Sequence, residues 1–199
     1  MKKAIIGAGG FGREVYWSLS LMERVGCKFF VDNKYYFEGD ENVLPMSKFD
    51  PQEYEVVVAV GDPSYRKSIV DSLPKGTKFF THIHPSVEIL GPDVTIGEGS
   101  IICVGTILTT NIVLGKHTHL NLQTTIGHDC RIGDYFTTAP GAKISGNCEI
   151  GDKVYFGTNA SVRQKIKICD EVTIGLNAGV VKDINEPGIY GGVPTKKLK

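Results

Sequence analysis

The second part of the chain has a six-residue period that few folds accommodate. An α-helix would spread such a stripe around its surface, because it has about 3.6 residues per turn. Antiparallel strands alternate with a period of two and need hairpin turns, which this region lacks. A hexapeptide period is typical of a β-solenoid in which each flat face takes one hexad. Every sixth residue is bulky and apolar, with Thr138 as the exception: Leu90, Ile96, Ile102, Leu108, Leu114, Leu120, Ile126, Ile132, Thr138, Ile144, Ile150, Phe156, Val162, Ile168, Ile174 and Val180.

Small residues occupy two further places of the hexad. Four places after the apolar residue the side chain is small or β-branched, except at Phe136. Three hexads close one triangular coil, so residues 90–179 predict five coils. We expect the glycines to serve the corners, where the backbone conformation disfavours a Cβ. Glycine follows the apolar residue at Gly91, Gly97, Gly115, Gly127, Gly133, Gly151, Gly157 and Gly175.

The first 83 residues have no such period and alternate strand and helix patterns. This alternation predicts a small parallel sheet of the Rossmann type. The ligand of such a sheet binds at the carboxyl ends of its strands, where Gly9, Asp32 and Gly61 lie. Strands are expected over residues 3–6, 27–31, 55–60 and 78–81, and helices over 13–24 and 65–73.

The glycine-rich segment Gly7–Gly12 follows the first strand, and Asp32 comes twenty residues after Gly12. This spacing is typical of a dinucleotide-binding motif, because glycines let phosphate approach the amides at a helix start. Only one mononucleotide-binding half fits in about 80 residues, so a single nucleotide is predicted. The alternative is that these glycines serve only the strand-to-helix turn.

Composition excludes several classes of function. Lys+Arg and Asp+Glu are both 22, so bulk charge gives no attraction to nucleic acid or to an anionic membrane. No apolar run reaches the roughly 18 residues of a spanning helix, and the first residues lack the apolar stretch of a signal peptide. The five cysteines include no CxxC pair and are predicted to be buried thiols of a reducing cytoplasm, without disulfides. No side-chain cluster has the spacing of a metal site.

These hexads resemble those of the hexapeptide-repeat acyltransferases, whose coils form a left-handed parallel β-helix. A small Rossmann-like domain before the coils is similar to the nucleotide-sugar N-acetyltransferases of bacterial glycan synthesis, and Gly191–Lys196 is similar to their closing motif. The resemblance implies a nucleotide-sugar-binding domain at 1–83, a left-handed β-helix at 84–183 and a C-terminal tail at 184–199. It also implies a cytoplasmic homotrimer that uses acetyl-CoA to acetylate the 4-amino group of a UDP- or dTDP-linked 4-amino-4,6-dideoxy sugar.

His128 is the candidate general base. Amide formation from a thioester needs a base for the amine proton and donors for the developing oxyanion. His128 and Asp129 occupy outward-facing places of their hexad, and a neighbouring carboxylate fixes the tautomer of an imidazole and raises its basicity. The family's base lies in a matching His-Glu/Asp-Cys segment, which implies the same roles here. A solvated His–Asp pair without a catalytic role is the alternative.

The 18-residue coil places Gly146 directly above or below His128, so its N–H is the candidate oxyanion donor. The resemblance further implies that Asn121 lies near the reacting centre and that acetyl-CoA lies in a groove between subunits. The implied acetyl-CoA contacts are Thr137, Gly146, Thr158, Gly175 and Leu176, with Thr137 in a place where the family commonly has histidine. The implied nucleotide-sugar contacts are Gly9, Gly10, Phe11, Asp32, Asn33 and Gly61, with Phe11 in another common histidine place.

The remaining polar candidates are ambiguous. His117 and His119 either contact substrate or are structural, and His82 and His84 lie at the domain junction. Arg13 and Arg66 either offer charge to a diphosphate or are surface residues, whereas Cys130 and Cys148 should stack inside the coil as core fillers. Two other functions stay open: a sugar or sialic acid O-acetyltransferase, and a non-catalytic nucleotide-sugar-binding scaffold.

Overall fold

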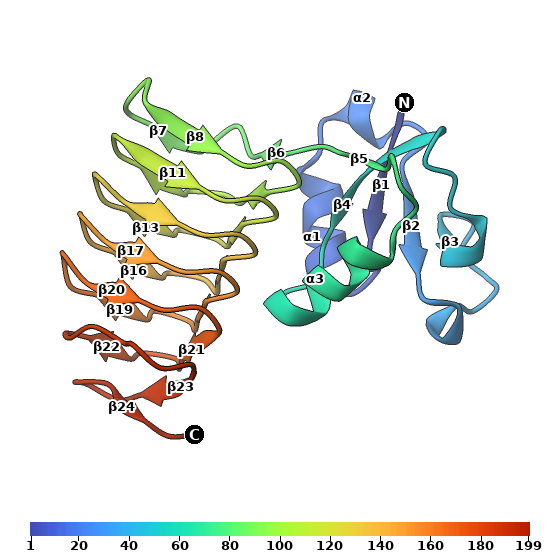
Figure 1. The fold of residues 1–199 in the computed structure, drawn as a ribbon. Helices are drawn as coiled ribbons and strands as arrows, with labels where there is room; N and C mark the ends of the chain where they lie inside the picture. Colours follow the sequence, from blue (N-terminus) through green and yellow to red (C-terminus); the bar gives the residue numbers. More distant parts are fainter.

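The computed structural model describes residues 1–199 and consists of an α/β domain beside a three-sided parallel β-helix (Figure 1). The two predicted parts are therefore both present. The coils stack along one axis, and the α/β domain packs beside the N-terminal coils, from the coil of His82 to that of Thr137.

The α/β domain is built on one parallel sheet in which β1 is central. Alternate strand residues point to opposite faces. Val15 and Leu19 cover the face that presents Ile5, and Ile69 covers the face that presents Val56. Helices α1 and α3 therefore lie on opposite sides, as in a Rossmann-type sheet. The sheet order is β3 (Val43–Pro45), β2 (Lys28–Val31), β1 (Lys2–Ile6), β4 (Tyr54–Val58) and β5 (Lys78–Phe79), and the helices are α1 (Gly10–Ser18), α2 (Leu21–Arg24) and α3 (Pro63–Ser72).

The helix predicted over 13–24 is two helices. Helix α1 already begins at Gly10, and it ends at Ser18, after which Leu19 is extended. Ser20 then starts α2 with a capping box, in which its hydroxyl accepts from the Glu23 N–H and its own N–H donates to the Glu23 carboxylate. Such a cap stabilises a new helix start more than continuation through the serine. The edge strand β3 was not predicted, because three residues carry too little pattern.

The β-helix has three faces, which we number 1 to 3 in chain order. Face 1 contains β6 (His82–Ile83), β9 (Ile101–Ile102), β12 (His119–Leu120), β15 (Thr137–Thr138), β18 (Tyr155–Phe156), β21 (Val172–Ile174), β23 (Gly188–Gly191) and β24 (Lys196–Lys197). Face 2 contains β7 (Glu88–Ile89), β10 (Ile107–Leu108), β13 (Thr125–Ile126), β16 (Lys143–Ile144), β19 (Ser161–Val162) and β22 (Gly179–Val180). Face 3 contains β8 (Val94–Ile96), β11 (Ile112–Leu114), β14 (Arg131–Ile132), β17 (Glu149–Ile150) and β20 (Lys167–Ile168).

The predicted left-handed parallel β-helix is confirmed, and the hexad residues form its core. Partners such as Ile126 and Ile144 pair at the 18-residue spacing of one coil. The exception Thr138 is buried too, and its hydroxyl accepts from the Asn121 N–H at 3.0 Å and shares a 2.8 Å hydrogen bond with Thr124. A polar residue is tolerated there because its hydrogen bonds are satisfied.

The register prediction at Leu90 is wrong. Leu108 pairs with Ile89 rather than with Leu90, and Leu90 is 65% exposed. The corner between β7 and β8 contains one extra residue, since Glu88 pairs with Ile107 whereas Thr95 pairs with Val113. The six-residue spacing to Ile96 hid this insertion.

The predicted reason for the hexad glycines, a corner backbone conformation that disfavours a Cβ, is also wrong. The left-handed backbone recurs every six residues at other positions, many of them non-glycine, such as Asn111 and Asn159. The hexad glycines do not have positive φ. A Cβ on Gly97 would instead lie 2.5 Å from the carbonyl carbon of Gly115 in the next coil. Glycine is required there because neighbouring coils approach closely.

Arg66 joins the two parts of the molecule. It is fully buried at the start of α3, so it does not offer charge to a diphosphate from the surface. Its guanidinium donates to the carbonyl oxygens of His117 at 3.0 Å and Tyr135 at 2.8 Å, and to the hydroxyl of Thr137 at 2.8 Å. It also donates to Nδ1 of His119 at 3.1 Å, which fixes that ring as neutral. Both histidines are thus structural parts of the junction.

The remaining histidines and the cysteines differ in how far they are buried. His82 is buried and shares a 2.7 Å hydrogen bond with Ser18 of α1, whereas His84 is half-buried and its Nδ1 lies 2.8 Å from the Ser86 hydroxyl. All five cysteines are free, and Cys130 and Cys148 are buried in the coil core as predicted. Cys27 is buried too, but the prediction of burial is wrong for Cys103 and Cys169, which are only partly buried.

Candidate active site

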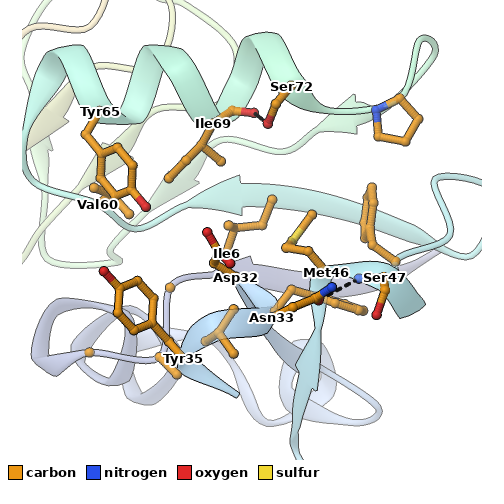
Figure 2. Close-up of a pocket in the computed structure, with 17 residues that line it drawn as sticks. Ile6, Asp32, Asn33, Tyr35, Met46, Ser47, Val60, Tyr65, Ile69 and Ser72 are labelled. Atoms are coloured by element: carbon orange, nitrogen blue, oxygen red, sulfur yellow. Dashed lines mark hydrogen bonds between the residues drawn. The ribbon is translucent and has the colours of Figure 1, made fainter.

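The α/β domain contains a cavity of about 790 Å³ at the carboxyl ends of its strands (Figure 2). Three predicted nucleotide-sugar residues, Gly9, Asp32 and Asn33, line it. Gly10, Phe11 and Gly61 do not. Phe11 packs against the ring of His119, with ring centroids 5.3 Å apart, and the Gly61 carbonyl accepts from Arg66.

The cavity wall is aromatic and apolar, with few polar groups. Tyr65 on α3 and Tyr35 lie on opposite sides of the cavity, and Met46 lies beside Ser47 (Figure 2). No lysine or arginine lines it. Gly9 begins α1 without a side-chain cap, so the first N–H groups of this helix are free for an anionic group. A flat, partly apolar group with an attached anion fits these walls. Neither tyrosine was a sequence candidate, because no local pattern marked them.

His128 lies at the edge between faces 2 and 3, between β13 and β14. Its Nδ1 is 2.6 Å from Oδ2 of Asp129, and both side chains are about half exposed. The other carboxylate oxygen of Asp129 accepts from Nδ2 of Asn111 at 2.6 Å. The hydrogen bonds from His128 and Asn111 lower the pKa of Asp129, so this carboxylate is ionised at neutral pH. An ionised acceptor holds the proton on Nδ1 and leaves Nε2 as the basic atom.

Gly146 stacks directly on the imidazole, as the 18-residue spacing predicts. A Cβ at this position would lie 2.7 Å from Nε2 of His128. The Gly146 carbonyl accepts from the Lys165 N–H, whereas the Gly146 N–H has no acceptor within the chain. A free amide therefore lies in the coil next to the basic nitrogen. This pairing of a base with a hydrogen-bond donor is the arrangement that acyl transfer requires.

The other predicted residues lie on a different edge. Asn121, Thr158, Gly175 and Leu176 follow face 1 strands at the edge between faces 1 and 2, where Thr158 and Leu176 are exposed. One chain therefore does not bring them to His128. Thr137 is separate again: it is buried under the α/β domain, where it binds Arg66, and its position does not support the predicted acetyl-CoA contact.

The structure contains no group of three or more His, Cys, Asp or Glu side chains that could hold a metal ion. None of its helices has the length and apolarity needed to cross a membrane.

Comparison with known proteins gives consistent matches. Residues 2–73 match the PglD N-terminal domain family. A GDP-perosamine N-acetyltransferase of Escherichia coli is 32% identical over 155 residues, which cover 71% of this chain and 69% of that protein. The acetyltransferase domain of PglB from Neisseria gonorrhoeae, solved in complex with acetyl coenzyme A, is 30% identical with a TM-score of 0.86 over 99% of both chains. WeeI from Acinetobacter baumannii is 31% identical with a TM-score of 0.87, over 98% of this chain and 99% of that one.

Proposed function

Because this chain belongs to the hexapeptide-repeat sugar N-acetyltransferases, and is thus an acetyl-CoA-dependent acyltransferase, we propose that its acceptor is a GDP-linked amino sugar of the perosamine type. The similarity to a GDP-perosamine N-acetyltransferase supports guanosine diphosphate as the nucleotide of the acceptor. The cavity in residues 1–83 supports the site, since about 790 Å³ lies within the range of small-molecule pockets. The predicted UDP- and dTDP-linked 4-amino sugars are the alternative acceptors that the assay below distinguishes.

We assign acetyl transfer to the coils at 84–183, with His128 as base. Nε2 of His128 takes a proton from the sugar amine while the amine nitrogen attacks the thioester carbonyl. Asp129 stabilises the resulting imidazolium, and the Gly146 N–H donates to the oxyanion. When the intermediate collapses, the C–S bond breaks and the imidazolium returns the proton to the departing thiolate. The contact between His128 and Gly146 is the observation that carries this assignment.

The division of the site between two edges supports a trimer. The α/β domain packs against face 1 (Figure 1), where Arg66 bonds Thr137 and Ser18 bonds His82. The edge between faces 2 and 3, which carries His128, therefore lies on the opposite side of the coils. If face 2 of three chains surrounds a common axis, the edge of His128 in each chain meets the edge of Asn121 and Leu176 in the next. We therefore propose a homotrimer with acetyl-CoA between these two edges.

The side chains of the free faces support this orientation. Face 3 presents the charged row Arg131, Glu149 and Lys167, with a 2.9 Å ion pair between the last two. Face 2 presents the row Glu88, Ile107, Thr125, Lys143, Ser161 and Gly179, which is uncharged except at Glu88 and Lys143. Depletion of charge is typical of the centre of an interface. Light scattering after size exclusion should give a trimer, and a fully active monomer would exclude the shared site.

The decisive assay is thiol release from acetyl-CoA with GDP-perosamine, UDP- and dTDP-4-amino-4,6-dideoxy sugars, and sialic acid. Rapid release with GDP-perosamine supports the proposal. Rapid release only with a UDP- or dTDP-linked sugar would show that the proposed nucleotide is wrong and identify the correct one. Turnover of sialic acid alone would identify an O-acetyltransferase, and binding of acetyl-CoA without turnover a scaffold. His128→Ala should lose roughly 100-fold or more in kcat. The five free thiols support the predicted cytoplasmic location.

A further inference from the structure

Asp129 is held by a residue of the preceding coil that the proposed chemistry does not use. Asn111 lies 18 residues before it, at the same corner and in the same left-handed backbone conformation. Its Nδ2 donates to Oδ1 of Asp129 at 2.6 Å, while Oδ2 of Asp129 contacts Nδ1 of His128 at 2.6 Å. Each carboxylate oxygen thus has one partner, and the carboxylate cannot rotate without losing both.

The orientation of the Asn111 amide is fixed by a fourth residue. Nη2 of Arg131 donates to Oδ1 of Asn111 at 2.8 Å, and Nη1 donates to the Asn111 backbone carbonyl at 2.7 Å. Because a guanidinium only donates, the atom facing it must be the amide oxygen. The amide nitrogen therefore points to Asp129. The four residues form one directed chain of hydrogen bonds from Arg131 to the imidazole.

We propose that Asn111, oriented by Arg131, is a positioning residue for catalysis that holds Asp129 against His128. The inference rests on the proposed role of His128 as base. In this role Asn111 keeps the proton on Nδ1 of His128, so that Nε2, which lies beside Gly146, is the basic atom. A side chain that held only the coil together would not need a donor aimed at the carboxylate.

Few charged groups lie near Asp129, so the effect of a new charge at position 111 can be attributed to a few neighbours. The charged groups near Asp129 are Asp93, two coils before it, and Arg131 in its own coil. The following coil presents Gly146 and Asn147, which do not titrate. A new carboxylate at position 111 would thus act mainly on Asp129 and the imidazolium.

Two substitutions separate positioning from folding. Asn111→Gly removes the amide without backbone strain, because glycine adopts positive φ freely. It should lower kcat roughly tenfold, as expected for loss of a hydrogen bond to a charged group, and leave both KM values within about twofold. Asn111→Asp keeps the shape but adds a negative charge that stabilises the imidazolium. The acidic limb of the kcat/KM profile should then move up by about half a pH unit or more.

Lys153→Gly is the matched control. Lys153 has the same left-handed backbone, at the edge between faces 3 and 1, and its side chain pairs only with Glu171. It should keep wild-type kcat and pH profile. If His128→Ala retains wild-type activity, both the proposed base and this inference are overturned. If His128→Ala is inactive while folded Asn111→Gly and Asn111→Asp behave like wild type, the role of Asn111 alone is overturned.

Discussion

Arg66→Met should weaken the junction between the α/β domain and the β-helix. The guanidinium is buried and donates to the carbonyl oxygens of Val60 at 2.7 Å, His117 at 3.0 Å and Tyr135 at 2.8 Å. No carboxylate lies within ion-pair distance of it. Burial lowers the pKa of Arg66 to about 9, which leaves it charged at neutral pH. Backbone dipoles thus provide the compensation for this charge.

The magnitude follows from the groups that methionine leaves unpaired. Methionine replaces most of the apolar stem but donates no hydrogen bond. Each buried carbonyl that loses its partner costs about 1–3 kcal/mol, so three of them cost roughly 3–9 kcal/mol. Removing the charge also removes its desolvation cost, which offsets several kcal/mol. We expect a net loss of about 3–4 kcal/mol in the free energy of unfolding.

Urea unfolding followed by two signals tests this value. The only tryptophan, Trp17, lies on α1 and reports the α/β domain, whereas far-UV circular dichroism reports the whole chain. The Trp17 transition should move to lower urea than the main transition. Arg13→Met is the control, because Arg13 is exposed and makes one 3.2 Å hydrogen bond, to the Ala8 carbonyl. Coincident transitions with an unchanged midpoint for Arg66→Met would refute the reasoning.

Three further predictions concern pH and glycine. Burial and the nearby Arg66 lower the pKa of His117 to about 4, so its stabilising contribution is complete above pH 6.5 and is lost as the pH falls toward 4. Urea unfolding at pH 5 should show a loss of about 2 kcal/mol from this group, and His117→Asn should reduce the dependence. Gly146→Ala should lower kcat/KM roughly 100-fold with little change in melting temperature, because its Cβ would meet only the exposed His128 ring. Gly97→Ala should instead lower stability by about 2 kcal/mol or more in the same urea assay, since its Cβ would meet the backbone of Gly115.

The repeat made most of the β-helix predictable, because each hexad position has one environment. Ile126 and Ile144 are equivalent in sequence and adjacent in space. The failure at Leu90 has the same origin. A regular spacing to Ile96 continues across a corner with an extra residue, and only the pairing of Leu108 with Ile89 reveals the insertion.

The candidate site was predictable where it followed the 18-residue coil and unpredictable where it depended on packing between the two parts. The contact between His128 and Gly146 follows from their spacing. The spacing from Asn111 to Asp129 is the same and was available in the sequence, but nothing local distinguishes a bonded asparagine from a corner residue. Arg66 has the pattern of a surface arginine in α3, and the sequence does not show that the coils cover it and accept its hydrogen bonds.

The β-helix also explains how a site can be built from few residues. Corner positions of successive coils form a column, and Asn111, Asp129 and Asn147 occupy one such column with the same left-handed backbone. Side chains in a column point outward, so polar changes there do not disturb the apolar core. Adjacent members of a column are one strand spacing apart, about 4.8 Å, which is within reach of a side-chain hydrogen bond. A histidine placed beside such a column gains an ordered carboxylate from its own coil, a support from the coil before and a free amide from the coil after. Three coils are therefore enough to orient a base, although the acceptor and acetyl-CoA need the neighbouring chains.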